Sequence, residues 1–179
     1  MVIYGAAGLT ARAQAYDLLT RAAAEHWGLQ GLPALARGER GKPFFPGLTG
    51  REFNLSHSGD VALCVLDEGP VGVDVQKVKV WRDSLPRRVC SPEERAWLGE
   101  DTDFWERFAQ LWALKESRAK YAGAGLTRPI SSIRVPLPGP EEDLMELDGL
   151  WFRTYAGTDW RGAACGQTPP PKTVRWVVL

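Results

Sequence analysis

Helical and strand-like segments occur in blocks along the chain, and their order limits the folds open to it. Residues 11–27 are rich in alanine and leucine, and helical spacing places Leu18, Leu19 and Ala22 on one side. A stretch rich in glycine and proline then breaks this period. Three strand-like runs follow, at residues 52–56, 61–66 and 71–76. The Asp-Glu-Gly-Pro turn between the last two runs predicts a β-hairpin.

A second block opens with a helix-start motif. Ser91 can act as the N-cap and Pro92 suits the first helical position. Glu94 completes a capping box, so we predict a short helix that ends near Leu98.

Apolar residues at helical spacing predict a longer helix over residues 103–122, which Gly123 or Gly125 can end. The rest of the chain is divided by Pro and Gly turns into strand-like segments. These segments are residues 130–137, 150–155, 160–165 (the weakest) and 174–179.

This order predicts an α+β fold made of two related halves. An N-terminal α+β half over residues 1–79 is expected to meet a C-terminal α+β half over residues 80–179 in a single compact unit. The length of 179 residues fits one domain or two small halves that share a core.

Composition excludes several classes of protein. The 22 basic and 22 acidic residues balance, so no overall field would draw the chain to nucleic acid or an anionic membrane. No segment approaches the roughly 18 consecutive apolar residues that a membrane span needs, so we expect a cytoplasmic protein without a membrane partner. The three cysteines include no Cys-x-x-Cys pair, which supports neither a disulfide framework nor a thiolate zinc site.

The first candidate for chemistry lies in the strand-like run of residues 71–76. Alternation places its three valines on one face and Gly72, Asp74 and Gln76 on the other. An aspartate inside a valine run must be solvated, paired or bound to a cation. The alternative is that Asp74 lies on the exposed edge of the hairpin.

The long helix carries the second candidate. Glu116 lies one turn after Trp112 and one turn before Lys120, so it borders the core if Trp112 is buried. A carboxylate there can reach a neighbouring strand. The alternatives are a solvated Glu116 to Lys120 ion pair, which has the favourable i,i+4 order, and a surface charge at Lys115.

Two further segments offer groups to an anion. Ser56, His57 and Ser58 supply hydroxyls, backbone N–H groups and an imidazole. A serine hydrolase is disfavoured, because adjacent Ser56 and His57 point in opposite directions on an extended chain. Lys42, between a glycine and a proline, suits a loop cation that meets phosphate, with a solvated turn as the alternative.

In their order along the chain, four motifs resemble the series found in the 4′-phosphopantetheinyl transferases. These are Gly41-Lys42-Pro43, Phe53-Asn54-Leu55-Ser56-His57-Ser58, Gly72-Val73-Asp74-Val75, and Trp112-Ala113-Leu114-Lys115-Glu116 with Lys120. The first helix, with Arg12 and Arg21, resembles the basic helix of that family. In length the chain resembles the Sfp-type branch of the family. In that branch two halves related by a pseudo-twofold axis lie in one polypeptide and form the site between them, which implies a monomer.

The resemblance implies an enzyme that moves 4′-phosphopantetheine from coenzyme A (CoA) to a serine hydroxyl of an apo acyl or peptidyl carrier protein and releases 3′,5′-ADP. Such enzymes activate carriers of fatty-acid, polyketide and nonribosomal-peptide biosynthesis. One alternative is a catalytically silent relative that binds CoA or a carrier without transfer. Another is a small α+β scaffold whose motifs match by chance.

The resemblance also implies a Mg²⁺ site with Asp74 and Glu116 as ligands. The family often has a second acid two residues after the aspartate, where this chain has Gln76. An amide can ligate through oxygen, directly or through a water, but it brings no charge. Gln76 therefore counts against a three-carboxylate site and against tight metal binding.

Catalytic roles are implied for Asp74, Lys120 and Glu116, with Glu116 as the candidate base that takes the serine proton. Positive charge and hydrogen bonds to the phosphates of CoA would come from a larger set. This expected CoA-binding set is Arg12, Lys42, Pro43, Ser56, His57, Asp74, Lys115 and Lys120.

Overall fold

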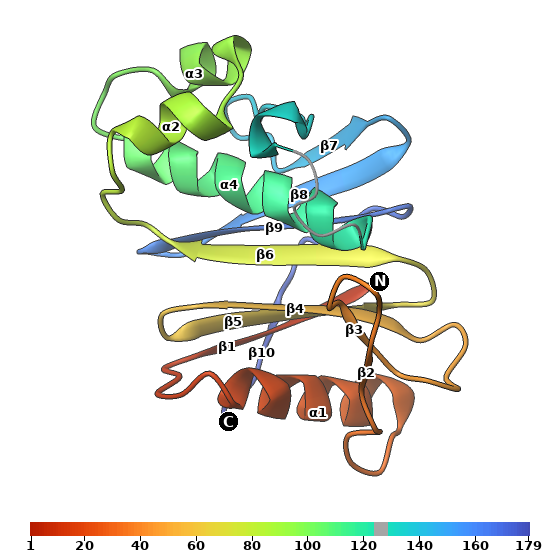
Figure 1. Cartoon of the computed structure of the whole chain (residues 1–179). Coiled ribbons are helices and arrows are strands. Elements are labelled where there is room, and N and C mark those ends of the chain that lie inside the picture. Colours follow the sequence, from red (N-terminus) through yellow and green to blue (C-terminus); the bar gives the residue numbers. More distant parts are fainter. Residues whose placement is uncertain (124–128) are drawn as a thin grey trace.

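The computed structural model describes residues 1–123 and 129–179 and has four layers, as Figure 1 shows. Helix α1 (Gln14–Trp27) covers one sheet, a second sheet lies on the other face of the first, and helix α4 (Phe104–Tyr121) covers the second sheet. This arrangement confirms the predicted α+β class.

The first sheet has the strand order β10-β1-β5-β4. Its strands are β1 (Val2–Ala7), β4 (Glu52–Ser58), β5 (Val61–Asp67) and β10 (Arg175–Trp176). Strand β5 pairs antiparallel with both β1 and β4, whereas β10 pairs parallel with β1. Strand β4 is therefore an edge strand of this sheet.

The second sheet has the strand order β6-β9-β8-β7 and is antiparallel throughout. Its strands are β6 (Val71–Lys77), β7 (Leu144–Leu147), β8 (Leu150–Ala156) and β9 (Trp160–Gly166). Strand β6 is an edge strand of this sheet, and β4 and β6 are in contact.

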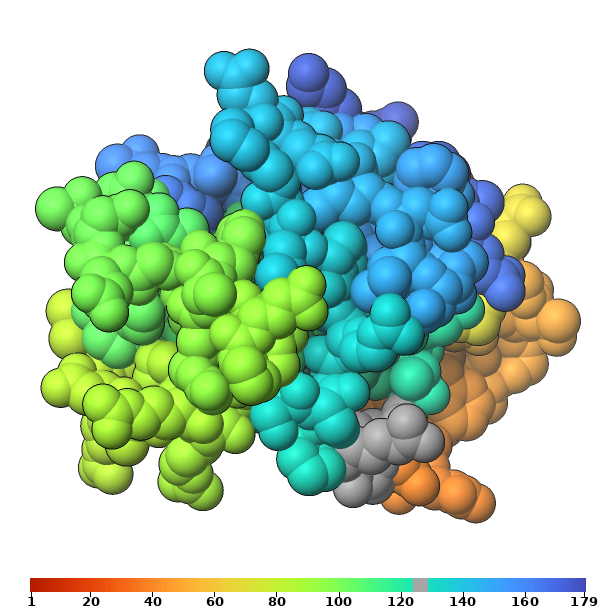
Figure 2. All heavy atoms as spheres, turned by 90° about the horizontal axis from the view of Figure 1, so that it is seen from above, coloured from red at the N-terminus to blue at the C-terminus, as the bar shows by residue number. Residues whose placement is uncertain are grey.

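Short elements complete the chain. Helices α2 (Ser84–Val89) and α3 (Pro92–Leu98) lie near α4, and a 3₁₀ turn follows at Ile130–Ser132. Figure 2 shows the green spheres of α2 and α3 beside the cyan spheres of the segment after residue 129. A small two-stranded sheet, β2 (Ala36–Arg37) with β3 (Pro43–Phe44), precedes β4.

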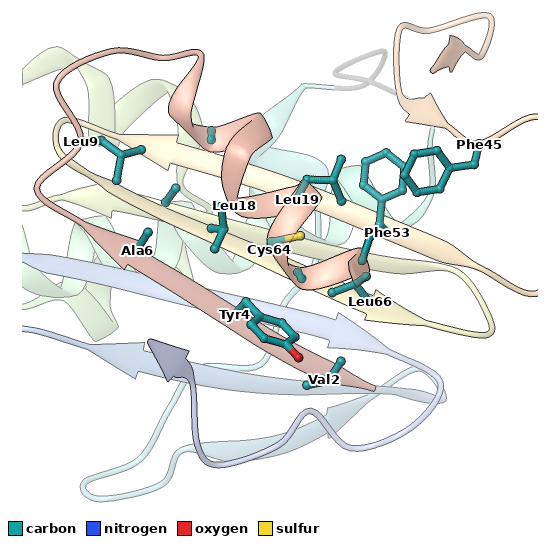
Figure 3. Packing of buried hydrophobic residues seen from close by; sticks show 14 residues of the cluster. Val2, Tyr4, Ala6, Leu9, Leu18, Leu19, Phe45, Phe53, Cys64 and Leu66 are labelled. Carbon is teal, nitrogen blue, oxygen red and sulfur yellow. The ribbon is translucent and has the colours of Figure 1, made fainter. Parts of the chain in front are cut away.

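Side-chain alternation divides the interior into three apolar layers. Leu18 and Leu19 of α1 pack on Cys64 and Phe53 of the first sheet, as Figure 3 shows. Between the sheets, the valines of β6 meet Ile3, Leu63 and their neighbours. A third cluster lies between α4 and the second sheet and includes Phe152.

The helix predictions are largely confirmed. The predicted helix over 103–122 is α4, and the Ser91 capping box begins α3 as expected. The first helix starts at Gln14 rather than at residue 11, because the Gln14 side chain accepts hydrogen bonds from the backbone N–H groups of Thr10 and Ala11. Gly123 follows the end of α4 with a positive φ of 61°, whereas Gly125 lies outside the described residues.

The predicted hairpin of residues 61–66 and 71–76 is wrong. Both segments are strands, but β5 already has β1 and β4 on its two edges, so no edge is left for β6. Strand β6 instead crosses to the second sheet and pairs with β9. The turn between β5 and β6 is therefore the connection from one sheet to the other.

Two predicted strands are also corrected. Residues 130–137 form only a 3₁₀ turn and then no regular structure, because Pro136 lacks the N–H group that a ladder needs. The segment 174–179 pairs over Arg175–Trp176 alone. Strand β6, from the predicted N-terminal half, belongs to the second sheet, and β10, from the predicted C-terminal half, belongs to the first. The predicted boundary between residues 79 and 80 stays a prediction.

Among residues 1–123 and 129–179, no helix is both long enough and apolar enough to cross a membrane.

Candidate active site

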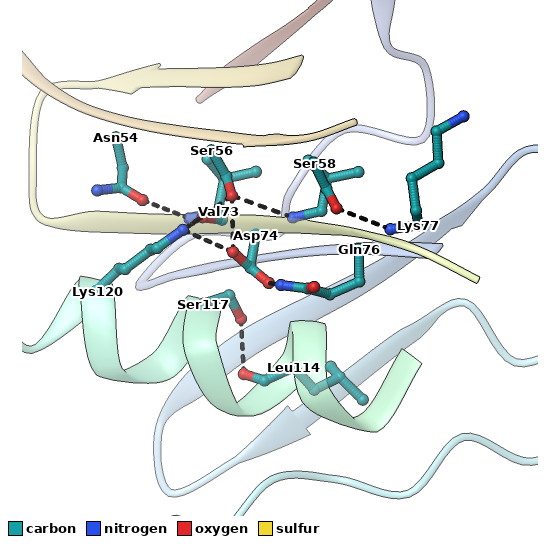
Figure 4. A network of polar contacts seen from close by, with 11 residues as sticks. Asn54, Ser56, Ser58, Val73, Asp74, Gln76, Lys77, Leu114, Ser117 and Lys120 are labelled. Atoms are coloured by element: carbon teal, nitrogen blue, oxygen red, sulfur yellow. Dashed lines mark hydrogen bonds and ion pairs between the residues drawn. The ribbon is translucent and has the colours of Figure 1, made fainter. Parts of the chain in front are cut away.

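The edges of the two sheets meet along a seam between β4 and β6. The even-numbered residues of β4 point to β6 and accept hydrogen bonds from its backbone N–H groups, as Figure 4 shows. These bonds join Asn54 Oδ1 to Val73 N at 3.0 Å, Ser56 Oγ to Val75 N at 3.3 Å and Ser58 Oγ to Lys77 N at 3.0 Å. Side chains thus replace a neighbouring strand along this edge of β6.

Two lysines satisfy carbonyl groups on the same edge. The Lys42 Nζ donates to the Val71 carbonyl oxygen at 3.1 Å, and the Lys120 Nζ donates to that of Val73, also at 3.1 Å. Lys42 comes from the loop before β3, and Lys120 comes from the last turn of α4. Positive charge from two distant segments is therefore fixed at one point of the seam.

The Asp74 carboxylate lies at the centre of this seam, with only 4% of its side chain exposed. Its Oδ1 accepts from the Lys120 ammonium at 2.6 Å and from the Ser56 hydroxyl at 2.7 Å. Its Oδ2 accepts from the Gln76 side-chain amide at 2.8 Å. Of the states expected for an aspartate in a valine run, Asp74 is paired.

Gly72 sets the distance between β6 and α4. A Cβ atom at this position would lie 1.9 Å from the Ser117 carbonyl oxygen and 2.6 Å from the Tyr121 backbone nitrogen. Only glycine allows so close an approach. This contact brings the last turns of α4, with Glu116 and Lys120, over Asp74.

Glu116 is half-buried beside Asp74. Burial raises the pKa of the Glu116 carboxyl, the negative charge of Asp74 raises it further, and Lys120 opposes both effects. Two carboxylates from different layers thus share one polar region. The ammonium group of Lys120 pairs with Asp74, and the ammonium group of Lys42 belongs to the pocket that Glu116 also lines.

Glu116 lines a pocket of about 230 Å³. Its lining includes Lys42, Pro43, Glu116 and Lys120, together with Arg40, Gly41, Asn54, Leu55, Ala119 and Gly123. Burial lowers the pKa of the Lys42 ammonium, with Glu52 opposing. A half-buried ammonium that lines a pocket is suited to an anionic ligand.

His57 lies on the opposite face of β4 from Ser56, as expected for neighbours in a strand. Burial lowers the pKa of its imidazole, and the positive charges of Arg12 and Lys120 lower it further, against Asp74. Arg12 is exposed in the turn before α1. Arg21 is exposed on α1 and pairs with Glu25.

Lys115 lies apart from the other predicted residues. Its ammonium is 2.7 Å from Glu94 and donates to the Ile130 carbonyl oxygen at 3.0 Å. Only 1% of its side chain is exposed. Lys115 therefore has no surface to offer a ligand, and neither of the roles expected for it, phosphate contact or surface charge, agrees with this position.

The donor set at the seam fits a hard divalent cation in part. Asp74 and Glu116 supply carboxylate oxygens, and a cation would relieve the repulsion by which Asp74 raises the pKa of Glu116. Gln76 presents its amide N–H to Asp74, leaving its own oxygen free of that bond. Within the described ranges no three His, Cys, Asp or Glu side chains converge, so any cation here would have at most two carboxylates.

The sequence did not single out Asn54 or Ser58 as partners of β6. The signal was present, because Asn54, Ser56 and Ser58 alternate with the apolar Phe53 and Leu55. Such alternation usually indicates a solvated face. Here the polar face meets the edge of another sheet.

Comparison with known proteins gives consistent matches. A family model described as the 4′-phosphopantetheinyl transferase superfamily matches residues 70–165, which contain Asp74, Gln76, Glu116 and Lys120. A 4′-phosphopantetheinyl transferase of Bacillus subtilis is 38% identical over 167 residues, which are 86% of this chain and 72% of that protein.

Two other relatives match over shorter stretches. The 4′-phosphopantetheinyl transferase Sfp of Bacillus subtilis strain 168 is 33% identical over 141 residues, 73% of this chain and 62% of that protein. The 4′-phosphopantetheinyl transferase AcpT of Salmonella typhi is 38% identical over 120 residues, 62% of this chain and 59% of that protein. The chain thus spans less than two thirds of the length of these two relatives.

Proposed function

The chain belongs to the 4′-phosphopantetheinyl transferase superfamily, a family of transferase enzymes, and from this premise we propose its reaction. It moves the 4′-phosphopantetheine group from CoA to a serine hydroxyl of an apo acyl or peptidyl carrier protein. The other product is 3′,5′-ADP.

One observation carries the proposal: Glu116, Lys120 and Lys42, from distant segments, line a single pocket, and Asp74 lies beside it, paired with Lys120. Asp74 comes from β6, Glu116 and Lys120 from α4, and Lys42 from the loop before β3. Phosphoryl transfer needs positioned positive charge around the phosphates and a base near the attacking hydroxyl. This pocket offers both.

In the transfer step, the serine oxygen attacks the phosphorus that bears the pantetheine arm. A P–O bond to serine forms, and the P–O bond to the bridging oxygen of the diphosphate breaks. The electron pair of that bond leaves with 3′,5′-ADP. The serine proton passes to Glu116, directly or through one water.

The environment of Glu116 suits it to this role. Burial and the Asp74 charge raise the pKa of its carboxyl, which makes the carboxylate a stronger base than a solvated glutamate. Asp74 keeps Lys120 in place by an ion pair of 2.6 Å. Asp74 therefore acts on the reaction through charge and position.

Cationic side chains would hold the phosphates of CoA. Lys42 and Lys120 line the pocket, and their ammonium groups can turn from the β6 carbonyls to phosphate oxygens. His57, on the other face of β4 from Ser56, and Arg12, whose charge acts on it, can meet a second phosphate group. The leaving diphosphate oxygen gains negative charge in the transition state, which Lys120 stabilises.

Mg²⁺ bound by Asp74 and Glu116 would neutralise diphosphate oxygens as a Lewis acid. In this role the Gln76 amide holds Asp74 in its orientation.

Intact-protein mass spectrometry tests the proposal. A panel of apo-carrier proteins is incubated with the protein, CoA and Mg²⁺, with an EDTA control. The expected result is a metal-dependent gain of one phosphopantetheine group on at least one carrier. CoA binding without a mass gain on any carrier would instead identify a silent relative, an outcome for which Gln76 is the supporting feature.

A further inference from the structure

The charges around the pocket differ from those of a site built to capture a free divalent cation. Asp74 and Glu116 bring two negative charges, and Lys42 and Lys120 bring two positive charges. The further charges near Lys42, those of Arg40 and Glu52, are also of opposite sign. The affinity of a site for a divalent cation rises with the number of its carboxylates. A site whose positive and negative charges cancel therefore binds such a cation weakly.

The hydrogen bonds of Asp74 reduce its capacity further. The carboxylate has about four lone-pair positions, and three of them accept bonds from Ser56, Lys120 and Gln76. A cation that binds Asp74 must use what remains or displace a partner.

The residue at position 76 determines the net charge around the pocket. A carboxylate at this position would leave the pocket negative, whereas the amide leaves it neutral and donates to Asp74 Oδ2 at 2.8 Å. The Gln76 side chain thus brings no charge to the site, and its hydrogen bond orients the Asp74 carboxylate.

From these observations we propose that the protein alone binds a divalent cation only weakly, and that the cation enters as a chelate with the diphosphate of CoA. The diphosphate supplies the negative charge that Gln76 does not. In return, Lys42 and Lys120 can pair with its oxygens. The inference rests on the proposed function and makes Gln76 the positioning residue that imposes this dependence.

Electron paramagnetic resonance of Mn²⁺ tests the proposal without measuring activity. Mn²⁺, a hard divalent probe, is titrated into the full-length chain alone, with CoA, or with 3′,5′-ADP, which lacks the diphosphate; CoA without protein is the blank. We expect CoA to raise the Mn²⁺ affinity of the protein about tenfold or more and 3′,5′-ADP to leave it nearly unchanged. Equal Mn²⁺ affinity with and without CoA would overturn the inference.

Three variants assign the effect to Gln76. Gln76→Glu should raise Mn²⁺ affinity in the absence of CoA about tenfold, the effect of one more charge beside the ion. Gln76→Met, which removes the amide without adding charge, should give no such rise. Gln30→Glu adds the same charge at an exposed residue distant in sequence from Gln76, and it should also leave the Mn²⁺ affinity unchanged.

The outcomes separate the inference from the proposed function. A Gln76→Glu variant with unchanged Mn²⁺ affinity would overturn the inference while leaving transfer open. Failure of CoA to bind, with or without Mn²⁺, would overturn the proposed function and the inference with it.

Discussion

Helix α4 carries two lysine–carboxylate pairs of almost equal length in opposite surroundings. Lys115 lies 2.7 Å from Glu94, with side-chain exposures of 1% and 8%. Lys120 lies 2.6 Å from Asp74, with exposures of 27% and 4%. The first pair is sealed beside the core under α3, and the second opens to the pocket. Distance alone therefore does not identify a functional pair, because what distinguishes it is access to a ligand.

The difference has a physical cause in the neighbours of each lysine. Lys115 is 1% exposed and contacts the Glu94 carboxylate and the Ile130 carbonyl oxygen. Lys120 donates to Asp74, Ser56 and the Val73 carbonyl, and the pocket borders its ammonium. A phosphate oxygen can replace one of these three acceptors. We therefore expect the pair at Lys115 to act on stability.

The largest effect is expected from removing a carboxylate on the open side. We predict that Asp74→Ala and Glu116→Ala each lower the transfer rate by roughly 10²–10⁴-fold, because each removes a positioned charge or base. Circular dichroism should show an intact fold. Asp159→Ala, which removes an exposed carboxylate from Lys77, is the matched control and should transfer at the wild-type rate. Wild-type rates in either site variant would exclude this pocket as the active site.

Breaking the closed pair should act on stability instead. Lys115→Met leaves the Glu94 carboxylate buried without its cation, so we predict a loss of about 3–5 kcal/mol in the free energy of unfolding. Urea denaturation measures this loss. The double variant with Glu94→Gln should recover part of it. A stable Lys115→Met protein with no transfer would instead indicate a role of Lys115 in catalysis.

Gly72→Ala should disturb both pairs through the packing of α4. Its Cβ would lie 1.9 Å from the Ser117 carbonyl oxygen, so the helix must move away from β6. We predict a loss of stability of about 1–3 kcal/mol and a lower transfer rate in the folded fraction. Gly69→Ala is the control, since its Cβ would meet only the Gln167 side chain, at 3.9 Å. Equal stabilities of the two variants would contradict the close contact.

The smallest effect concerns the pH dependence of stability on the open side. The pKa of His57 is lowered from 6.5 in the folded protein, so the unfolded chain binds more protons as the pH falls below 6.5. Stability from this source is therefore present above pH 6.5 and is lost as the pH falls toward the folded pKa. We predict a loss of stability in this direction, smaller than the effects described above.

Denaturation between pH 5 and pH 7.5 measures this loss, and His57→Gln should reduce it. His26→Gln is the comparison, because burial also lowers the pKa of His26, which lies on α1. The account of His57 would be contradicted if its replacement left the pH profile unchanged.

Much of the fold followed from local patterns. The capping box at Ser91 and the apolar period of α4 were sufficient to place two helices. Strand β1 was missed because Val2–Ala7 is buried on both faces, so it shows no alternation. Helix α2 was missed because it has only six residues and contains Pro86. The partner of β6 depends on which strand edges are free, and that is a property of the whole sheet.

The site shows the same limit. Alternation along β6 and helical spacing along α4 singled out Asp74, Glu116 and Lys120 as candidates, and the structure brings the three together at the seam. Their catalytic roles come from the family resemblance and stay predictions. Lys115 could not be separated from Lys120, since both lie on α4 and only tertiary contacts seal one of them. The role of Gly72 likewise depends on where α4 lies.

One measurement compares the two lysines directly. Intact-protein mass spectrometry follows the rate of phosphopantetheine addition to one apo-carrier by the wild type, Lys120→Met and Lys115→Met, at equal concentrations of folded protein. We predict a rate for Lys120→Met at least about 100-fold below the wild type and a rate for Lys115→Met within about threefold of it. Equal loss in both variants, or loss in Lys115→Met alone, would contradict the assignment of the active site to the seam between β4, β6 and α4.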